Sequence, residues 1–237
     1  MNVQADVNRD GFTIVDKYLD RDTIDRLVQD ITDLNLTPER AGIRNILELL
    51  PSVQQLAKSP EILALAKPIL GNLATVVRGI FFDKQPTANW KVPWHQDVTI
   101  AVKNRLELPD YQPWSSKGGI HHVQPPVTIL EQMLTVRIHL DKTDESNGAL
   151  KVISGSHCDG KLSSDAILQG RGCANDSWKQ IDSTICTCEP GGILLMRPLL
   201  LHASSAAIVP THRRVIHLDY AGCDLPDGLE WYNGFKR

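Results

Sequence analysis

The pattern His-x-Asp occurs three times in this sequence, as His95-Gln96-Asp97, His157-Cys158-Asp159 and His217-Leu218-Asp219. Two histidines and one carboxylate hold Fe(II) on one face and leave three coordination positions open. The pattern supplies two of these ligands, so the second histidine must come from a later strand that folds back beside the first. His217 has no histidine after it, and His157 precedes His202 by 202 − 157 = 45 residues, whereas His95 precedes it by 202 − 95 = 107. The spacing favours a metal site of His95, Asp97 and His202, with ordinary polar strand ends as the alternative.

Three tryptophans flank the first of these candidates, Trp90, Trp94 and Trp114. Aromatic walls around a polar centre are typical of a ligand pocket. The pair Cys186-Thr-Cys188 is one residue short of the metal-binding C-x-x-C spacing and has no second pair, so we interpret it as alternate positions of one strand.

Two adjacent arginines follow the second histidine, since Arg213 lies 213 − 202 = 11 residues after His202 and Arg214 comes next. A dicarboxylate that chelates the metal needs a cation for its far carboxylate, and the planar fork of arginine binds both oxygens. Neighbouring strand residues point to opposite faces, so one arginine is predicted to face the site and the other to be structural. Ser204 shares the face of His202.

Composition excludes several classes of function. The chain has 237 residues, 42% hydrophobic and 22% charged, with a formal charge of −3 at pH 7. Nucleic acids and anionic membranes both select a large positive field, so neither partner is expected. No apolar run approaches the roughly 18–20 residues of a membrane span. The first residues lack the pattern of a signal peptide, and the five cysteines are an odd number, so we expect a cytoplasmic protein with reduced thiols.

Helices precede strands along the chain. The apolar stripe of residues 24–34 predicts one helix, and Ser59, Pro60 and Gly71 mark the start and end of another. Strands are predicted at 12–15, 74–82, 133–141, 149–153, 184–188, 193–196 and 213–220. Asn147-Gly148 is typical of a tight hairpin turn. Helices followed by strands, without βαβ alternation, indicate a sandwich or barrel with a helical flank.

Two long stretches between strands read as irregular, from about 103 to 127 and from about 154 to 182. Loops of this length are often functional lids, with an ordered structural excursion as the alternative. The first is the candidate lid, with Trp114, His121, His122 and Gln124; its two histidines are predicted to form hydrogen bonds or substrate contacts, not to bind the metal.

Taken together, several motifs resemble the phytanoyl-CoA dioxygenase family of Fe(II)/2-oxoglutarate oxygenases. They are FFDKQP, WHQD, DESNGALKVISGSH, PLLLHASS and HRRVIHLDY, in order over residues 74–222. The resemblance implies a mainly β fold with flanking α-helices, in which the core is a double-stranded β-helix, or cupin-like jelly roll. We expect a single oxygenase domain over 1–237, with a helical flank at 1–72 and the jelly-roll core at 73–222.

Carried over by position, the resemblance implies that His95, Asp97 and His202 bind iron, and that Arg213 and Ser204 hold 2-oxoglutarate. It places Lys84 near the co-substrate. The sequence departs from the family at Arg137, where phytanoyl-CoA hydroxylase has a tryptophan. This arginine is expected either to contact 2-oxoglutarate or an anionic substrate, or to be a salt-bridged structural residue. The presence of Asp97 favours hydroxylation over halogenation, because related halogenases lack this carboxylate.

The predicted function is oxidation of a small organic substrate, one with an acidic group, by Fe(II), 2-oxoglutarate and O2. One alternative is a jelly-roll metal-binding or sensor protein that performs no oxidation. Another is hydrolysis or isomerisation with Zn(II) or Mn(II) at the same site. The sequence leaves the identity of the substrate and the oligomeric state open.

Overall fold

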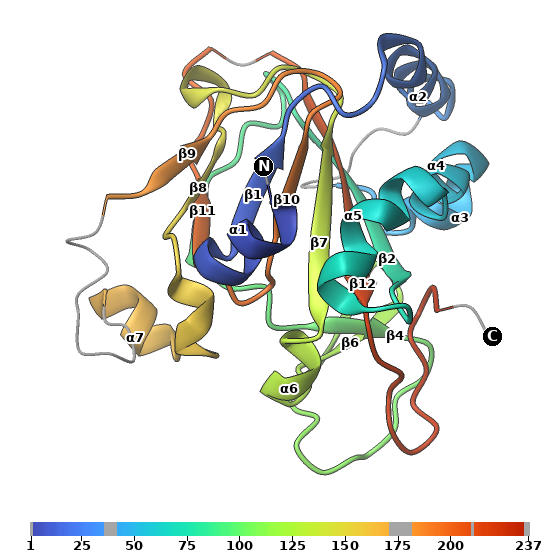
Figure 1. Ribbon diagram of the computed structural model, residues 1–237, viewed down its shortest axis with the longest axis vertical. Coiled ribbons are helices and arrows are strands. Elements are labelled where there is room, and N and C mark those ends of the chain that lie inside the picture. The colour runs from blue at the N-terminus through green and yellow to red at the C-terminus, as the bar shows by residue number, and fades with distance from the viewer. Residues whose placement is uncertain (1, 36–41, 171–181, 210, 235–237) are drawn as a thin grey trace.

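Two antiparallel sheets form the centre of the computed structural model, which describes residues 2–35, 42–170, 182–209 and 211–234 (Figure 1). The first sheet has the order β1 (Phe12–Val15), β10 (Ile193–Met196), β7 (Met133–His139), β12 (Arg213–Ala221) and β2 (Thr75–Lys84). The second has the order β3 (Val92–His95), β11 (His202–Ser204), β8 (Leu150–Val152) and β9 (Thr184–Cys186). The arrangement is the predicted jelly roll, mainly β with a helical N-terminal region.

The central strand β7 shows how this layering follows from the sequence. Its apolar positions Leu134, Val136 and Ile138 pack in the same core as the N-terminal helices. Its polar positions alternate with them and point to the opposite face, as the period of two predicts. All seven residues of β7 are buried, because helices cover one face and the second sheet covers the other. The polar face is therefore enclosed inside the protein.

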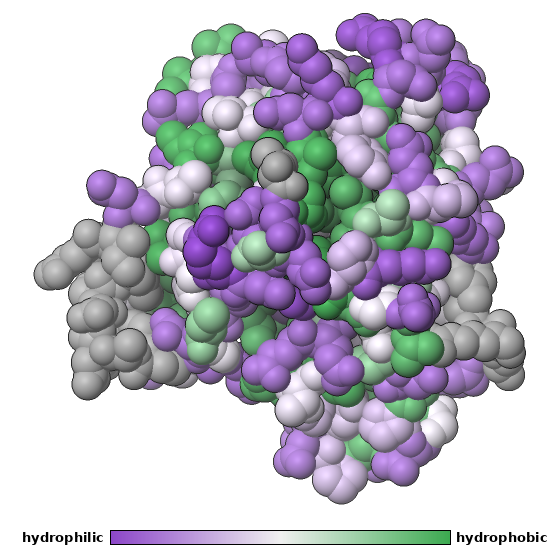
Figure 2. Space-filling model, viewed as in Figure 1, coloured by the Kyte–Doolittle hydropathy of each residue, from purple (hydrophilic) through white to green (hydrophobic). Residues whose placement is uncertain are grey.

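Helices cover the outer face of the first sheet. They are α1 (Val3–Asp10), α2 (Arg21–Asp33), α3 (Ile46–Leu49), α4 (Pro51–Ala57) and α5 (Pro60–Leu70). The α5 helix starts and ends as predicted, since the Ser59 side chain accepts a hydrogen bond from the backbone N–H of Ile62 and Gly71 adopts a positive φ. In Figure 2 the outer surfaces of α1 and α2 are hydrophilic, and apolar side chains show between the helices. None of the described helices has both the length and the apolar character needed to cross a membrane.

The stretch from 103 to 127 is irregular, as predicted, only as far as residue 113, and the rest differs from the prediction. It contributes to a third sheet, ordered β4 (Ile100–Val102), β6 (Ile120–Val123) and β5 (Trp114–Lys117), followed by α6 (Val127–Leu130). Gly118 and Gly119 join β5 to β6, and both have positive φ. Gly-Gly is one of the pairs that favour two-residue hairpin turns, so the signal was present but lay between short, polar strands.

The segment after β7 also differs from the prediction. Asn147-Gly148 does not close a hairpin, because β7 and β8 belong to different sheets. A short 3-10 helix, Glu145–Asn147, forms the crossover and ends at Gly148 with φ 79°. The stretch predicted as irregular from 154 contains a 3-10 helix, Ser156–Asp159, and α7 (Ser164–Gln169), while 171–181 lie outside the described residues.

A buried hydrogen bond joins the helical layer to the first sheet. The hydroxyl of Tyr220 on β12 donates to the carbonyl of Ala57 at 2.6 Å. We expect Tyr220→Phe to lower the free energy of unfolding by about 1–2 kcal/mol, because it deletes a buried hydrogen bond with little change in volume. Urea denaturation measures this loss. The control is Tyr18→Phe, which removes a bond to the Glu61 carbonyl near the surface and should cost less; equal losses would contradict the prediction.

Candidate metal centre

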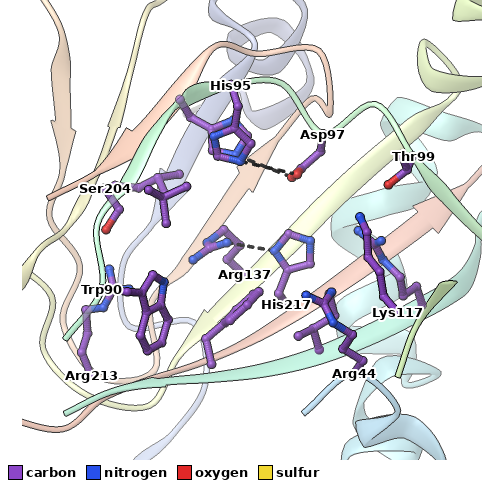
Figure 3. Close-up of a pocket in the computed structure, with 16 residues that line it drawn as sticks. Arg44, Trp90, His95, Asp97, Thr99, Lys117, Arg137, Ser204, Arg213 and His217 are labelled. Carbon is purple, nitrogen blue, oxygen red and sulfur yellow. Dashed lines mark hydrogen bonds and ion pairs between the residues drawn. The ribbon is translucent and has the colours of Figure 1, made fainter. Parts of the chain in front are cut away.

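His95 and His202 meet because the two strands that carry them pair directly. The antiparallel register of β3 and β11 places them opposite each other, with ring centroids 4.1 Å apart. Asp97 follows β3 by two residues, and its backbone N–H donates to the carbonyl of Pro198 at 2.9 Å. Its carboxylate oxygens lie 3.8 Å from His95 Nε2 and 3.6 Å from His202 Nε2 (Figure 3). Two imidazoles and one carboxylate thus converge closely enough to share one ion.

Backbone carbonyls select the tautomer that metal binding requires. His95 Nδ1 lies 2.9 Å from the carbonyl of Pro93, and His202 Nδ1 lies 2.8 Å from that of Leu200. A carbonyl only accepts hydrogen bonds, so both Nδ1 atoms carry the proton and both Nε2 lone pairs are free. Such outer hydrogen bonds fix ring orientation in metal sites. The Nε2 atoms are the ones that face Asp97.

The ionisation states also suit a metal. Burial lowers the pKa of His202 to about 4, so its imidazole is neutral at pH 7. Burial acts to raise the pKa of Asp97, but the neighbouring histidines and Arg78 lower it below its usual value. The cluster therefore offers a neutral buried imidazole and an ionised carboxylate, as Fe(II) coordination needs.

A cavity of about 350 Å³ adjoins this cluster. It lies between the polar face of the first sheet and the inner side of the second, and its walls carry five cationic side chains but only one carboxylate, that of Asp97. Of the three tryptophans that flank His95 in the sequence, only Trp90 lines the cavity. Trp94 and Trp114 pack instead against apolar clusters elsewhere, so the predicted wall of three tryptophans is reduced to one indole, with Phe82 as a second aromatic ring.

Arg213, Ser204 and Lys84 meet at one end of the cavity. The Lys84 ammonium donates to Ser204 Oγ at 2.9 Å, and Ser204 Oγ donates to the carbonyl of Gly148 at 2.9 Å. The same carbonyl accepts from Arg213 Nη1, whereas Arg213 Nε is buried without a partner. A buried N–H without an acceptor is costly, so this edge of the guanidinium suits a carboxylate. The arrangement fits one end of a dicarboxylate.

The end of the cavity that holds Arg213 is strongly positive. Burial, together with the charge of Arg137, lowers the pKa of Arg213 to about 10. Burial together with Arg213 and Arg137 lowers the pKa of Lys84 to about 8. Both groups remain mainly protonated at pH 7, and their mutual repulsion favours a bound anion.

The neighbouring arginine points the other way. Arg214 donates from Nη2 to Asp141 Oδ1 at 2.7 Å and from Nε to Asp141 Oδ2 at 2.8 Å. Alternation along β12 thus separates the two arginines, with Arg213 in the cavity and Arg214 in a structural ion pair.

Arg137 lines the cavity and belongs to a buried polar chain. Its Nη1 donates to His217 Nδ1 at 2.9 Å, so His217 carries its proton on Nε2, which lies 3.0 Å from Asp219 Oδ1. Asp219 also accepts from Arg78 Nε at 2.6 Å. Among the described residues Arg137 forms no salt bridge and its Nε has no partner, while the bond to His217 ties it to the buried chain.

The predicted lid contributes a residue that the sequence did not single out. Lys117 from β5 lines the cavity, and Trp114, His121, His122 and Gln124 do not. His122 is buried with Nδ1 3.0 Å from the carbonyl of Ile120, and His121 is exposed. Sequence reasoning also missed Arg44 and Arg78. The signal for Arg78 was a lone charge within the apolar run of β2; Arg44 offered none.

Comparisons with known proteins agree with this geometry. Residues 7–215 match the family described as Phytanoyl-CoA dioxygenase (PhyH). The epimerase SnoN of nogalamycin biosynthesis, described as non-heme and alpha-ketoglutarate dependent, is 15% identical, with a TM-score of 0.69 over 92% of this chain and 81% of that one. HygX from Streptomyces hygroscopicus, solved with nickel and 2-oxoglutarate, is 14% identical, with a TM-score of 0.67 over 93% and 86%. EctD from S. alaskensis is 18% identical, with a TM-score of 0.67 over 92% and 75%. A search of curated proteins gave no match.

A jelly roll that brings two histidines and an aspartate together beside a buried arginine defines the class of Fe(II)/2-oxoglutarate-dependent enzymes. The family match covers most of the sequence. The chain belongs to the phytanoyl-CoA dioxygenase family, and its metal and co-substrate are Fe(II) and 2-oxoglutarate.

Proposed function

We propose that this protein is a dioxygenase that hydroxylates an unactivated C–H bond of a small organic substrate. The observation that carries the proposal is the convergence of His95, Asp97 and His202 on a cavity that also contains the unpaired edge of Arg213. A group of metal-ligating side chains alone would suit many activities. The pairing of the cluster with a cationic end for a dicarboxylate favours 2-oxoglutarate chemistry.

In the proposed site His95, Asp97 and His202 hold Fe(II) through Nε2, carboxylate oxygen and Nε2. With 2-oxoglutarate and O2, the bound iron supplies oxidation of the substrate C–H bond, and the co-substrate becomes succinate and CO2. The carbonyls of Pro93 and Leu200 keep the imidazole protons on Nδ1, which prevents the rings from turning.

The co-substrate is oriented by the cationic end. Arg213 binds the far carboxylate through its free edge, and Ser204 stands beside it, positioned by the Lys84 ammonium. Arg137, with its own unpartnered Nε, adds a third cation to Arg213 and Lys84 at this end. The remaining walls include Ile80, Phe82, Val92 and Leu150, which exclude water from the reacting groups.

Turnover of the co-substrate without added substrate tests the proposal. We expect purified protein with Fe(II), ascorbate and O2 to convert 2-oxoglutarate slowly to succinate, and to stop when Zn(II) replaces Fe(II) or when oxygen is removed. Succinate is quantified by NMR. Binding of 2-oxoglutarate without any consumption would instead support the sensor alternative, and activity that persists without oxygen would support hydrolysis or isomerisation.

A further inference from the structure

A second group of cations lines the cavity away from Arg213. Arg44 comes from the turn before α3, Arg78 from β2 and Lys117 from the end of β5. In Figure 3 Arg44 and Lys117 lie together, on the opposite side of the view from Ser204 and Arg213. Burial and the charges of Arg78 and Arg44 lower the pKa of Lys117, as expected for like charges on one wall. Three segments far apart in the sequence thus concentrate positive charge on one wall.

Two of these cations have no ion-pair partner among the described residues, although the charge of Asp97 acts to raise the pKa of Lys117. Asp219 neutralises Arg78 at 2.6 Å. Within the part of the chain that the structure describes, Arg44 and Lys117 take part in no ion pair, and both are half-buried. The turn between β5 and β6 holds them near each other, since a Cβ placed on Gly118 would lie 3.9 Å from Arg44 Cδ. Partly desolvated cations without a partner are unfavourable, so the wall is built for an anion.

The expected metal and co-substrate do not supply that anion. Fe(II) adds two positive charges and 2-oxoglutarate two negative ones, so together they leave the charge of the cavity unchanged. Five lining cations then face one lining carboxylate, and Asp219 behind the wall offsets only one of them. Arg213 and Arg137 lie at the co-substrate end. The cations that lie away from that end and form no ion pair with a described residue are Arg44 and Lys117.

We propose that Arg44 and Lys117 bind an oxyanion of the primary substrate, either a carboxylate or a phosphate monoester. This inference rests on the proposed function, because it assumes that 2-oxoglutarate occupies the end with Arg213. Lys117 and Asp97 line the same cavity and lie on the same side of Figure 3, so an anion held by Lys117 leaves the rest of the substrate in the cavity that adjoins the metal ligands. The two cations therefore select acidic substrates and orient them.

Binding of simple anions to the Zn(II)- and 2-oxoglutarate-loaded protein tests the proposal without turnover. The probes are phenyl phosphate, benzoate and neutral benzamide, titrated by NMR line broadening. We expect at least one anion to bind about tenfold more tightly than benzamide, and Arg44→Gln or Lys117→Gln to weaken that anion about tenfold, as for loss of one charge-assisted hydrogen bond. Arg44→Lys keeps the positive charge, so it should retain part of the affinity that Arg44→Gln loses. Arg105→Gln is the matched control, since Arg105 pairs with Glu107 outside the cavity.

The pattern of binding decides the source of the oxyanion. Selective binding of phenyl phosphate indicates a phosphate ester, and selective binding of benzoate indicates a carboxylic acid. The proposal is overturned if neither anion exceeds benzamide, or if both bind equally well to the Arg44→Gln/Lys117→Gln double variant. Failure of the wild-type protein to consume 2-oxoglutarate with Fe(II) is a separate result, which contradicts the proposed function and leaves the measured anion affinities as they are.

Discussion

Replacing Asp97 with alanine is expected to abolish succinate formation, with a loss of at least about a hundredfold, and to weaken iron binding. Asp97 is the only carboxylate lining the cavity in the described structure. Without it, two neutral imidazoles would have to hold a dication beside Arg78 and Arg137, whose charges repel it. The loss is therefore electrostatic as well as a loss of one ligand. Iron content after dialysis and succinate release measure the two effects.

The sequence offers a matched control for this variant. Asp159 belongs to a second His-x-Asp pattern, but it lies in a 3-10 helix outside the metal cluster. Asp159→Ala should keep full iron binding and turnover, and circular dichroism shows whether both variants remain folded. If Asp97→Ala turned over at the wild-type rate with iron in excess, Asp97 would not be an iron ligand.

Spacing favoured this metal cluster over the other His-x-Asp patterns, and the family resemblance implied it, because its members lie at strand ends. The 107-residue interval between His95 and His202 contains β7 and β8, and the return of β11 beside β3 closes it. Alternation predicted that only one of the two adjacent arginines faces the site, but the pattern left open which one, and the resemblance implied Arg213. Only the packing of β12 against β2 and β7 determines that Arg213 faces inward.

Other parts of the site depend on tertiary packing that leaves no local pattern. Arg44 lies in a turn, and its place in the cavity depends on where the helical region meets the β5–β6 hairpin. The β5 strand has only four residues, and half of them are serines, so neither periodicity nor propensity indicated a strand. Lys117 was therefore missed with it. Trp94 and Trp114 were near His95 in sequence, but pleating directs them into separate apolar clusters.

Replacing Arg213 with glutamine is expected to raise the KM for 2-oxoglutarate about a hundredfold, because a buried charge-assisted contact made by two N–H groups is lost. Arg213→Lys should cause a smaller rise, since it keeps the charge but loses the planar fork. Initial rates of succinate formation over a range of 2-oxoglutarate concentrations measure both.

Arg214→Gln discriminates between the cavity and its surroundings. This neighbouring residue carries the same charge one position later, but it pairs with Asp141 on the other face of β12. Its loss should lower stability, because it breaks a part-buried ion pair, and should leave the KM for 2-oxoglutarate near the wild-type value, because that pair lies outside the cavity. If Arg214→Gln raised that KM and Arg213→Gln did not, the co-substrate would bind outside the cavity. Lys84 and Arg137 remain at this end of the cavity in Arg213→Gln. We therefore expect this variant to bind 2-oxoglutarate weakly, with an affinity that falls as ionic strength rises.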